Sequence, residues 1–117
     1  MSPLRPLPTP VERWQRIGLG IRLAYNPNKP GVIACYLGLG RHLAKQGLLD
    51  ECDTQRRMLR LLLQSGGDVA LPWRWRHACL EFAVHPLARL RQQADAEQLQ
   101  TAWQDAQRAL PTTPQLP

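Results

Sequence analysis

The sequence predicts an all-α protein: a compact antiparallel bundle of about five helices with flexible Pro-rich ends. Apolar residues recur at helical spacing, capping signals precede these stretches, and short Gly, Pro and Asn turns separate them. A length of 117 residues fits one domain. We assign residues 1–9 to a flexible N-terminus, residues 10–110 to a single helical domain and residues 111–117 to a flexible tail.

The first predicted helix covers residues 10–24 and begins with the capping-box pattern Thr9-Pro10-Val11-Glu12. Alternating apolar residues over 16–25 leave a strand open as an alternative, and Gly18 and Gly20 each weaken a helix by about 1 kcal/mol. We favour the helix because the sequence offers no second convincing strand to pair with it. Its apolar face would consist of Trp14, Ile17, Ile21 and Tyr25.

A second helix should follow the turn at residues 26–30, run to about Gln46 and end at Gly47. Small residues on it would let another helix approach closely. The predicted apolar face is Val32, Ile33, Tyr36, Leu37 and Leu43, with small residues at Ala34, Gly38 and Gly40.

Three further helices are expected after residue 49. Acidic residues from Asp50 onward favour a third helix start, and Gly66-Gly67 ends that helix, whose inward residues would be Cys52, Leu59, Leu62 and Leu63. A fourth helix starts at Leu71-Pro72 and should break near His85, because Pro86 cannot continue a helix interior. Asp95 with Gln98 would cap a fifth helix, with an apolar stripe at Leu99, Ala102, Trp103 and Ala106.

The composition indicates a cytoplasmic protein. No apolar run approaches the roughly 18 residues of a membrane span, and no secretory signal follows Arg5. An odd number of cysteines makes a poor disulfide framework, which favours free thiols in a reducing compartment. Cys35, His42, Cys52 and Cys79 would form a site only if the fold brought them together.

The net charge of +6 is unevenly distributed. Residues 1–49 carry seven Lys and Arg against Glu12 alone, whereas residues 95–117 have a net charge of −2. A pI near 10 permits nucleic-acid binding, which we keep as a further alternative. However, Arg56, Arg57 and Arg60 lie beside Asp53 on one predicted helix, which is typical of surface salt bridges.

The most distinctive local pattern is Trp73-Arg74-Trp75-Arg76. Tryptophan and arginine are the residues most enriched at binding hot spots, so we predict that these four residues form a partner-binding surface. The partner would be another protein or a second copy of the chain. A structural alternative places one tryptophan in the core, because Trp73 and Trp75 lie about 200° apart around a helix.

A polar stripe on the same helix suggests a metal site as the alternative function. His77, Glu81 and His85 follow one another at i,i+4 spacing, so either neighbouring pair suits a divalent ion such as iron, manganese or zinc. All three cannot reach one ion on a straight helix, since His77 and His85 lie about 12 Å apart. The simpler interpretation is a solvated Glu–His pair, and we expect no cofactor.

No nucleophile elbow, P-loop or complete dinucleotide fingerprint occurs, so we predict a non-enzymatic protein with no catalytic residues. The stretches 71–76, 79–81 and 86–90, with the turn at 26–30 and the helix at 57–63, resemble the small bacterial FagA (Fur-associated) family. In that family the gene lies beside those for fumarase C and a manganese superoxide dismutase, in an operon that iron represses. The resemblance implies an accessory factor made under iron limitation or oxidative stress, and it assigns no site residues.

Overall fold

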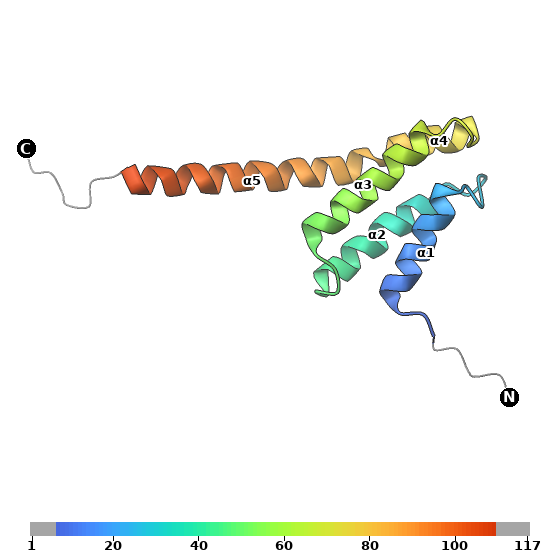
Figure 1. The fold of residues 1–117 in the computed structure, drawn as a ribbon, viewed down its shortest axis with the longest axis horizontal. Helices are drawn as coiled ribbons and strands as arrows, with labels where there is room; N and C mark the ends of the chain where they lie inside the picture. Colours follow the sequence, from blue (N-terminus) through green and yellow to red (C-terminus); the bar gives the residue numbers. More distant parts are fainter. Residues whose placement is uncertain (1–6, 110–117) are drawn as a thin grey trace, which may run out of the picture.

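Within residues 7–109 the fold consists of four helical runs, and a single residue divides the last run into two helices. The computed structural model describes residues 7–109, and the side chains of residues 7–105. The helices are α1 (Pro10–Arg22), α2 (Gly31–Lys45), α3 (Glu51–Gly67), α4 (Trp73–Phe82) and α5 (Val84–Ala109), as Figure 1 shows. No strand occurs within residues 7–109, so the all-α prediction is confirmed and the strand alternative for residues 16–25 is wrong.

The predicted capping signals lie where these helices begin and end. The Thr9 hydroxyl accepts the backbone N–H of Glu12 at 3.1 Å, as a capping box requires. The carboxylate of Asp50 accepts the N–H of Asp53 at 2.8 Å and caps α3 in the same way. Gly47 follows α2 with φ of 77°, a conformation that favours glycine. Local sequence therefore determines the boundaries of the first three helices.

Helix α3 lies at the centre of the fold and contacts all four other helices. Consecutive helices run in opposite directions from α1 to α4 (Figure 1). Where they meet they bury an apolar core, which consists of Trp14, Ile21, Ile33, Tyr36, Leu37, Leu43, Met58, Leu62, Trp75, Cys79 and Ala83.

Two glycines allow α1 and α2 to approach closely. A Cβ on Gly40 would lie 2.7 Å from Met58 Sδ and 2.8 Å from Trp14 Nε1. A Cβ on Gly18 would lie 2.9 Å from Cε1 of Tyr36. Each aromatic ring thus occupies the space that a glycine on the opposite helix leaves open. Glycine is required at both positions for packing rather than for an unusual backbone conformation.

The predicted fifth helix starting at Asp95 does not exist as a separate element. Helix α5 runs without a break from Val84 to Ala109. Pro86 lies in its first turn, where a helix needs no N–H donor, so the break falls earlier, at Ala83. From Leu87 to Ala109 the sequence is rich in Ala, Gln, Leu and Arg, which are strong helix formers. Nothing at Asp95 interrupts them.

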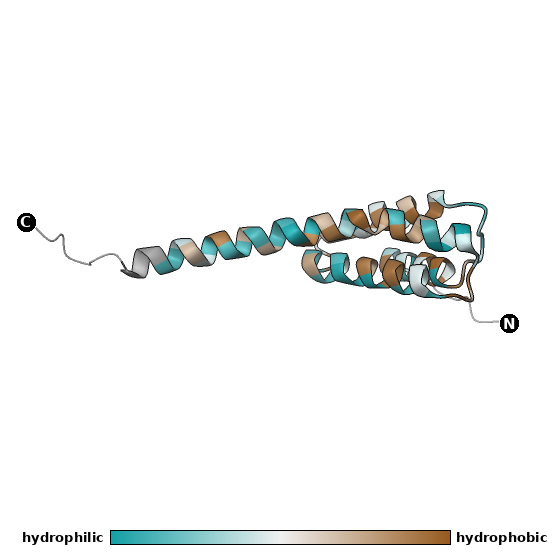
Figure 2. Ribbon diagram, turned by 90° about the horizontal axis from the view of Figure 1, so that it is seen from above, coloured by the Kyte–Doolittle hydropathy of each residue, from teal (hydrophilic) through white to brown (hydrophobic). Residues whose placement is uncertain are grey.

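The second half of α5 projects from the other helices (Figures 1 and 2). We call residues 94–105 the α5 arm; every one of them is exposed. The radius of gyration is 20.7 Å, against about 13 Å for a compact domain of this length. A compact five-helix antiparallel bundle is therefore not confirmed. The parts of the predicted flexible ends at residues 1–6 and 110–117 lie outside the described residues.

Within the described part of the chain, no helix is both long and apolar enough to cross a membrane. Figure 2 shows hydrophobic segments concentrated where the helices are stacked two deep, while the α5 arm is largely hydrophilic.

Candidate partner-binding surfaces

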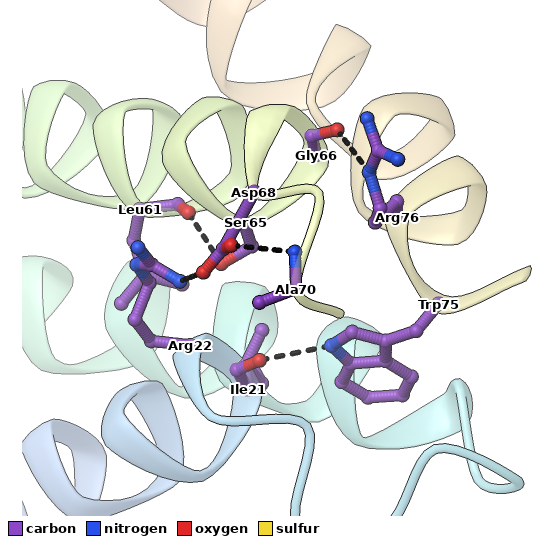
Figure 3. Close-up of polar contacts among 9 residues, drawn as sticks. All are labelled: Ile21, Arg22, Leu61, Ser65, Gly66, Asp68, Ala70, Trp75 and Arg76. Carbon is purple, nitrogen blue, oxygen red and sulfur yellow. Dashed lines mark hydrogen bonds and ion pairs between the residues drawn. The ribbon is translucent and has the colours of Figure 1, made fainter. Parts of the chain in front are cut away.

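The structure divides the four residues predicted to bind a partner. Trp75 is only 1% exposed, and its indole N–H donates to the backbone oxygen of Ile21 at 2.9 Å (Figure 3). That carbonyl belongs to the last turn of α1 and also accepts the backbone N–H of Ala24 at 3.1 Å. Trp75 therefore fills the core and joins α4 to the end of α1. Its assignment to a partner-binding surface is wrong.

Arg76 has a comparable structural role at the end of α3. Its Nε–H donates to the backbone oxygen of Gly66 at 3.0 Å, again a carbonyl in a last helical turn (Figure 3). Next to it, Arg22 of α1 pairs with Asp68 at 2.7 Å, and Asp68 also accepts the N–H of Ala70 at 2.9 Å. These hydrogen bonds, with that of Arg22 first, hold the pKa of Asp68 below its usual value. Through its Nε–H, Arg76 thus joins α4 to the end of α3.

Trp73 and Arg74 do lie on the surface, beside the polar stripe of α4. Trp73 is 70% exposed, and its ring stacks on His77 with centroids 5.4 Å apart. His77 Nδ1 lies 3.3 Å from the carboxylate of Glu81, and both side chains are more than half exposed. This arrangement matches the predicted solvated Glu–His pair. Trp73, Arg74, His77 and Glu81 form what we call the α4 surface.

For the alternative of a metal site, the structure brings together only His77 and Glu81. His85 lies beyond the break at Ala83, on α5, with its ring 6.2 Å from that of Phe82. No group of three or more His, Cys, Asp or Glu residues suited to a metal ion occurs within the described residues. The cysteines are separate as well: Cys35 is exposed, whereas burial raises the pKa of the Cys79 thiol to about 11.

Several arginines of the basic sequence contact other parts of the protein. The guanidinium of Arg57 lies over the Trp14 ring, 5.1 Å from its centroid. Arg22 and Arg76 make the contacts described above. Three of the cations on which nucleic-acid binding would depend therefore stabilise the junctions between helices.

A groove of about 340 Å³ opens between α2, α3 and α5. Its floor is apolar, with Leu37, Met58 and Phe82, while Arg41 and Arg89 lie on its walls. Small residues leave it wide on the α2 side: Ala34 and Gly38 are exposed, and a Cβ on Gly38 would meet no atom within 4 Å. The remaining lining residues are Gln55, His85, Pro86, Ala88 and Gln92.

The α5 arm carries an exposed apolar pair that the sequence alone did not indicate as a binding site. Leu99 and Trp103 belong to the apolar stripe predicted for the fifth helix, and Leu99 is 72% exposed and Trp103 is 65% exposed on the α5 arm. Their i,i+4 spacing places them on one face of the helix. The sequence signal was the stripe itself; only the fold shows that this stripe has no partner helix within the described residues.

No protein-family model, curated protein or solved structure matches the chain. The resemblance to the FagA family therefore stays a prediction.

Proposed function

We propose that this protein is a non-enzymatic, helical protein-interaction factor and that the α5 arm is its docking element. The observation that carries the proposal is the exposed pair Leu99 and Trp103 on a helix that has left the core. The surface of a monomer contains many single apolar residues, but a projecting helix with an apolar face is a common recognition element.

The energetics of the arm support docking. A tryptophan buries roughly 200 Å², and at about 25 cal/mol per Å² covering the exposed part of Trp103 would yield about 3 kcal/mol. Leu99 on the same face adds to this. The helix is already formed, so binding would not require the arm to fold first.

The test compares the intact protein with the double variant Leu99→Ala, Trp103→Ala. Proteins that bind the intact chain are captured from cells and purified. The Kd of each for the intact protein and for the double variant is then measured by calorimetry. We expect the double variant to raise that Kd at least about 30-fold, as loss of a tryptophan hot spot does. Trp73→Ala is the matched control, because Trp73 is exposed to a similar degree on another helix.

Two results would contradict this function. Equal affinity of the double variant for every partner would remove the α5 arm as the binding site. A larger loss of affinity in Trp73→Ala would place the binding site on the α4 surface instead.

The biological setting is proposed from the FagA resemblance alone: an accessory factor in the cytoplasm under iron limitation or oxidative stress. Protein abundance in cells of its source should rise when iron is chelated and fall when iron is restored. Constant abundance would remove this setting and leave the docking proposal untouched.

A further inference from the structure

The apolar face of α5 changes direction where the helix leaves the other helices. Before residue 94 its more buried side chains include Pro86, Leu90 and Gln93. At about 100° per residue, Leu99 and Trp103 lie about 120° around the helix from these residues. The arm therefore does not extend the face by which α5 packs on its own fold. Its apolar residues face a different direction.

That direction is the groove side of α5. His85, Arg89 and Gln92 line the groove, and Ala96, Leu99 and Trp103 continue the same stripe. The spacing along this stripe alternates between four and three residues. Such spacing is typical of the face by which one helix pairs with another. One stripe thus begins as a groove wall and ends as an exposed apolar ridge.

The groove and the arm are complementary in shape. The arm presents two large side chains, Leu99 and Trp103, on a straight helix. The groove offers an apolar floor, and its walls carry Ala34, Gly38 and Ala88, which leave space for large side chains. Small wall residues also permit a close approach of helices.

Their charges are complementary as well. Between Gln92 and Gln107 the sequence has three acidic residues and no Lys or Arg. The groove carries Arg41 and Arg89 and has no acidic lining residue among those described. Attraction between the arm and a groove of this composition would favour binding and reduce pairing of two acidic arms side by side.

From these relations we infer that the chain pairs with a second copy of itself, each α5 arm laying Leu99 and Trp103 into the groove of the other copy. This inference rests on the proposed function and names the partner. The two α5 helices run antiparallel, so that Trp103 faces His85 and Leu99 faces Arg89 across a two-fold axis near residue 94.

Two-fold symmetry also supplies the required area. One arm in one groove is a small contact, but symmetry makes the contact twice. The dimer would bury about 1,000 Å² of surface, which is the lower limit for a specific interface. This area comes from two Trp103 rings, two Leu99 side chains and the groove walls that they cover.

The test is sedimentation velocity on the full chain over a wide concentration range. The intact protein should show a two-chain mass at high concentration. Leu99→Ala with Trp103→Ala should raise the dimer Kd at least about 30-fold. Gly38→Trp should do the same by filling the groove, and circular dichroism should show an intact helix fold because that position is open. Trp73→Ala is the control and should leave the dimer Kd unchanged.

The antiparallel register is tested by cross-linking. Arg89→Cys with Leu99→Cys, in a background where Cys35 and Cys52 are serine, should give a covalent dimer on oxidation. Within one helix these positions lie about 15 Å apart, too far for a disulfide, so the bond must join two chains. Leu99→Cys alone should give none, since the two Leu99 positions lie far from each other in this register.

The outcomes separate this inference from the proposed function. A monomer at every concentration overturns the pairing, while arm-dependent binding of another purified protein would still support the docking function. A dimer that survives both Gly38→Trp and the arm variant overturns the pairing too, because its interface would lie elsewhere. If no partner, self or other, depends on Leu99 and Trp103, both proposals fail.

Discussion

Trp14 and Tyr36 stack with ring centroids 5.3 Å apart and planes 7° from parallel, and each ring covers a glycine four residues beyond the other. Trp14 contacts Gly40, and Tyr36 contacts Gly18. The indole N–H of Trp14 also donates to the backbone oxygen of Tyr36 at 3.2 Å. An aromatic residue followed by glycine at i+4 thus occurs on both α1 and α2, and the two pairs interlock.

This interlock predicts opposite effects for two alanine substitutions on α2. Gly40→Ala should destabilise the fold by about 1–3 kcal/mol, because the new methyl would press on Trp14 and Met58. Gly38→Ala should stabilise it by up to about 1 kcal/mol, since the position is open and alanine favours a helix. Urea unfolding in dilute solution measures both. Equal changes would mean that the close approach at Gly40 carries no packing energy.

Burial of Tyr36 predicts a loss of stability at high pH. Desolvation raises the pKa of its phenol to about 12, against 10.0 for an unperturbed tyrosine. The unfolded chain releases this proton near pH 10 while the folded chain keeps it. Stability from this group is therefore full below pH 10 and falls by about 2–3 kcal/mol as pH rises towards 12.

Urea unfolding between pH 8 and 11.5 measures this dependence. Tyr36→Phe should lack it, whereas Tyr25→Phe, at a tyrosine that is 65% exposed, should retain it. Identical pH profiles for Tyr36→Phe and the intact protein would assign the alkaline transition to other groups.

The two tryptophans of α4 should differ sharply in their effect on stability. Trp75→Phe should cost about 1–3 kcal/mol, because it removes the hydrogen bond to Ile21 and leaves a cavity. Trp73→Phe should change stability by less than about 0.5 kcal/mol, since this ring is on the surface. Thermal unfolding of the two variants measures the contrast, and a loss in Trp73→Phe as large as in Trp75→Phe would contradict the assignment.

The three thiols should react in order of exposure. Cys35 is exposed, Cys52 is partly exposed and Cys79 is buried with a thiol pKa raised to about 11. At pH 8 the smaller thiolate fraction alone should slow Cys79 about 100-fold. Labelling with a thiol reagent, read by mass spectrometry, should modify Cys79 only after denaturant is added. Modification of Cys79 at the rate of Cys35 would show that the core opens readily.

The starts and ends of the first three helices were predictable because they depend on neighbouring residues. Thr9, Asp50 and Gly47 each satisfy or terminate backbone hydrogen bonds within a few residues. Burial was harder to predict. Tyr25 lies past the end of α1 and is 65% exposed, and Leu63 of α3 is 49% exposed although both belonged to predicted apolar faces.

The candidate site was predicted least well, since exposure depends on how distant segments meet. Sequence alone could not show that Trp75 packs against α1, because its hydrogen-bond partner Ile21 lies 54 residues away along the chain. Nor could it tell that Leu99 and Trp103 lie beyond the reach of α3. Their apolar spacing is the same as that of a core stripe. Only the length by which α5 extends past the other helices distinguishes this exposed stripe from a core stripe.

The junction of Trp75, Arg22 and Asp68 also determines the order in which the chain can assemble. Arg22 and Asp68 are 46 residues apart, and Trp75 and Ile21 are 54 apart, so both contacts close long loops. The contacts of α1 with α2, of α2 with α3 and of α3 with α4 join neighbours along the chain and can form earlier. Docking of α4 against α1 is thus a late step, and exchange of the Trp75 indole proton with solvent reports when that step is reversed.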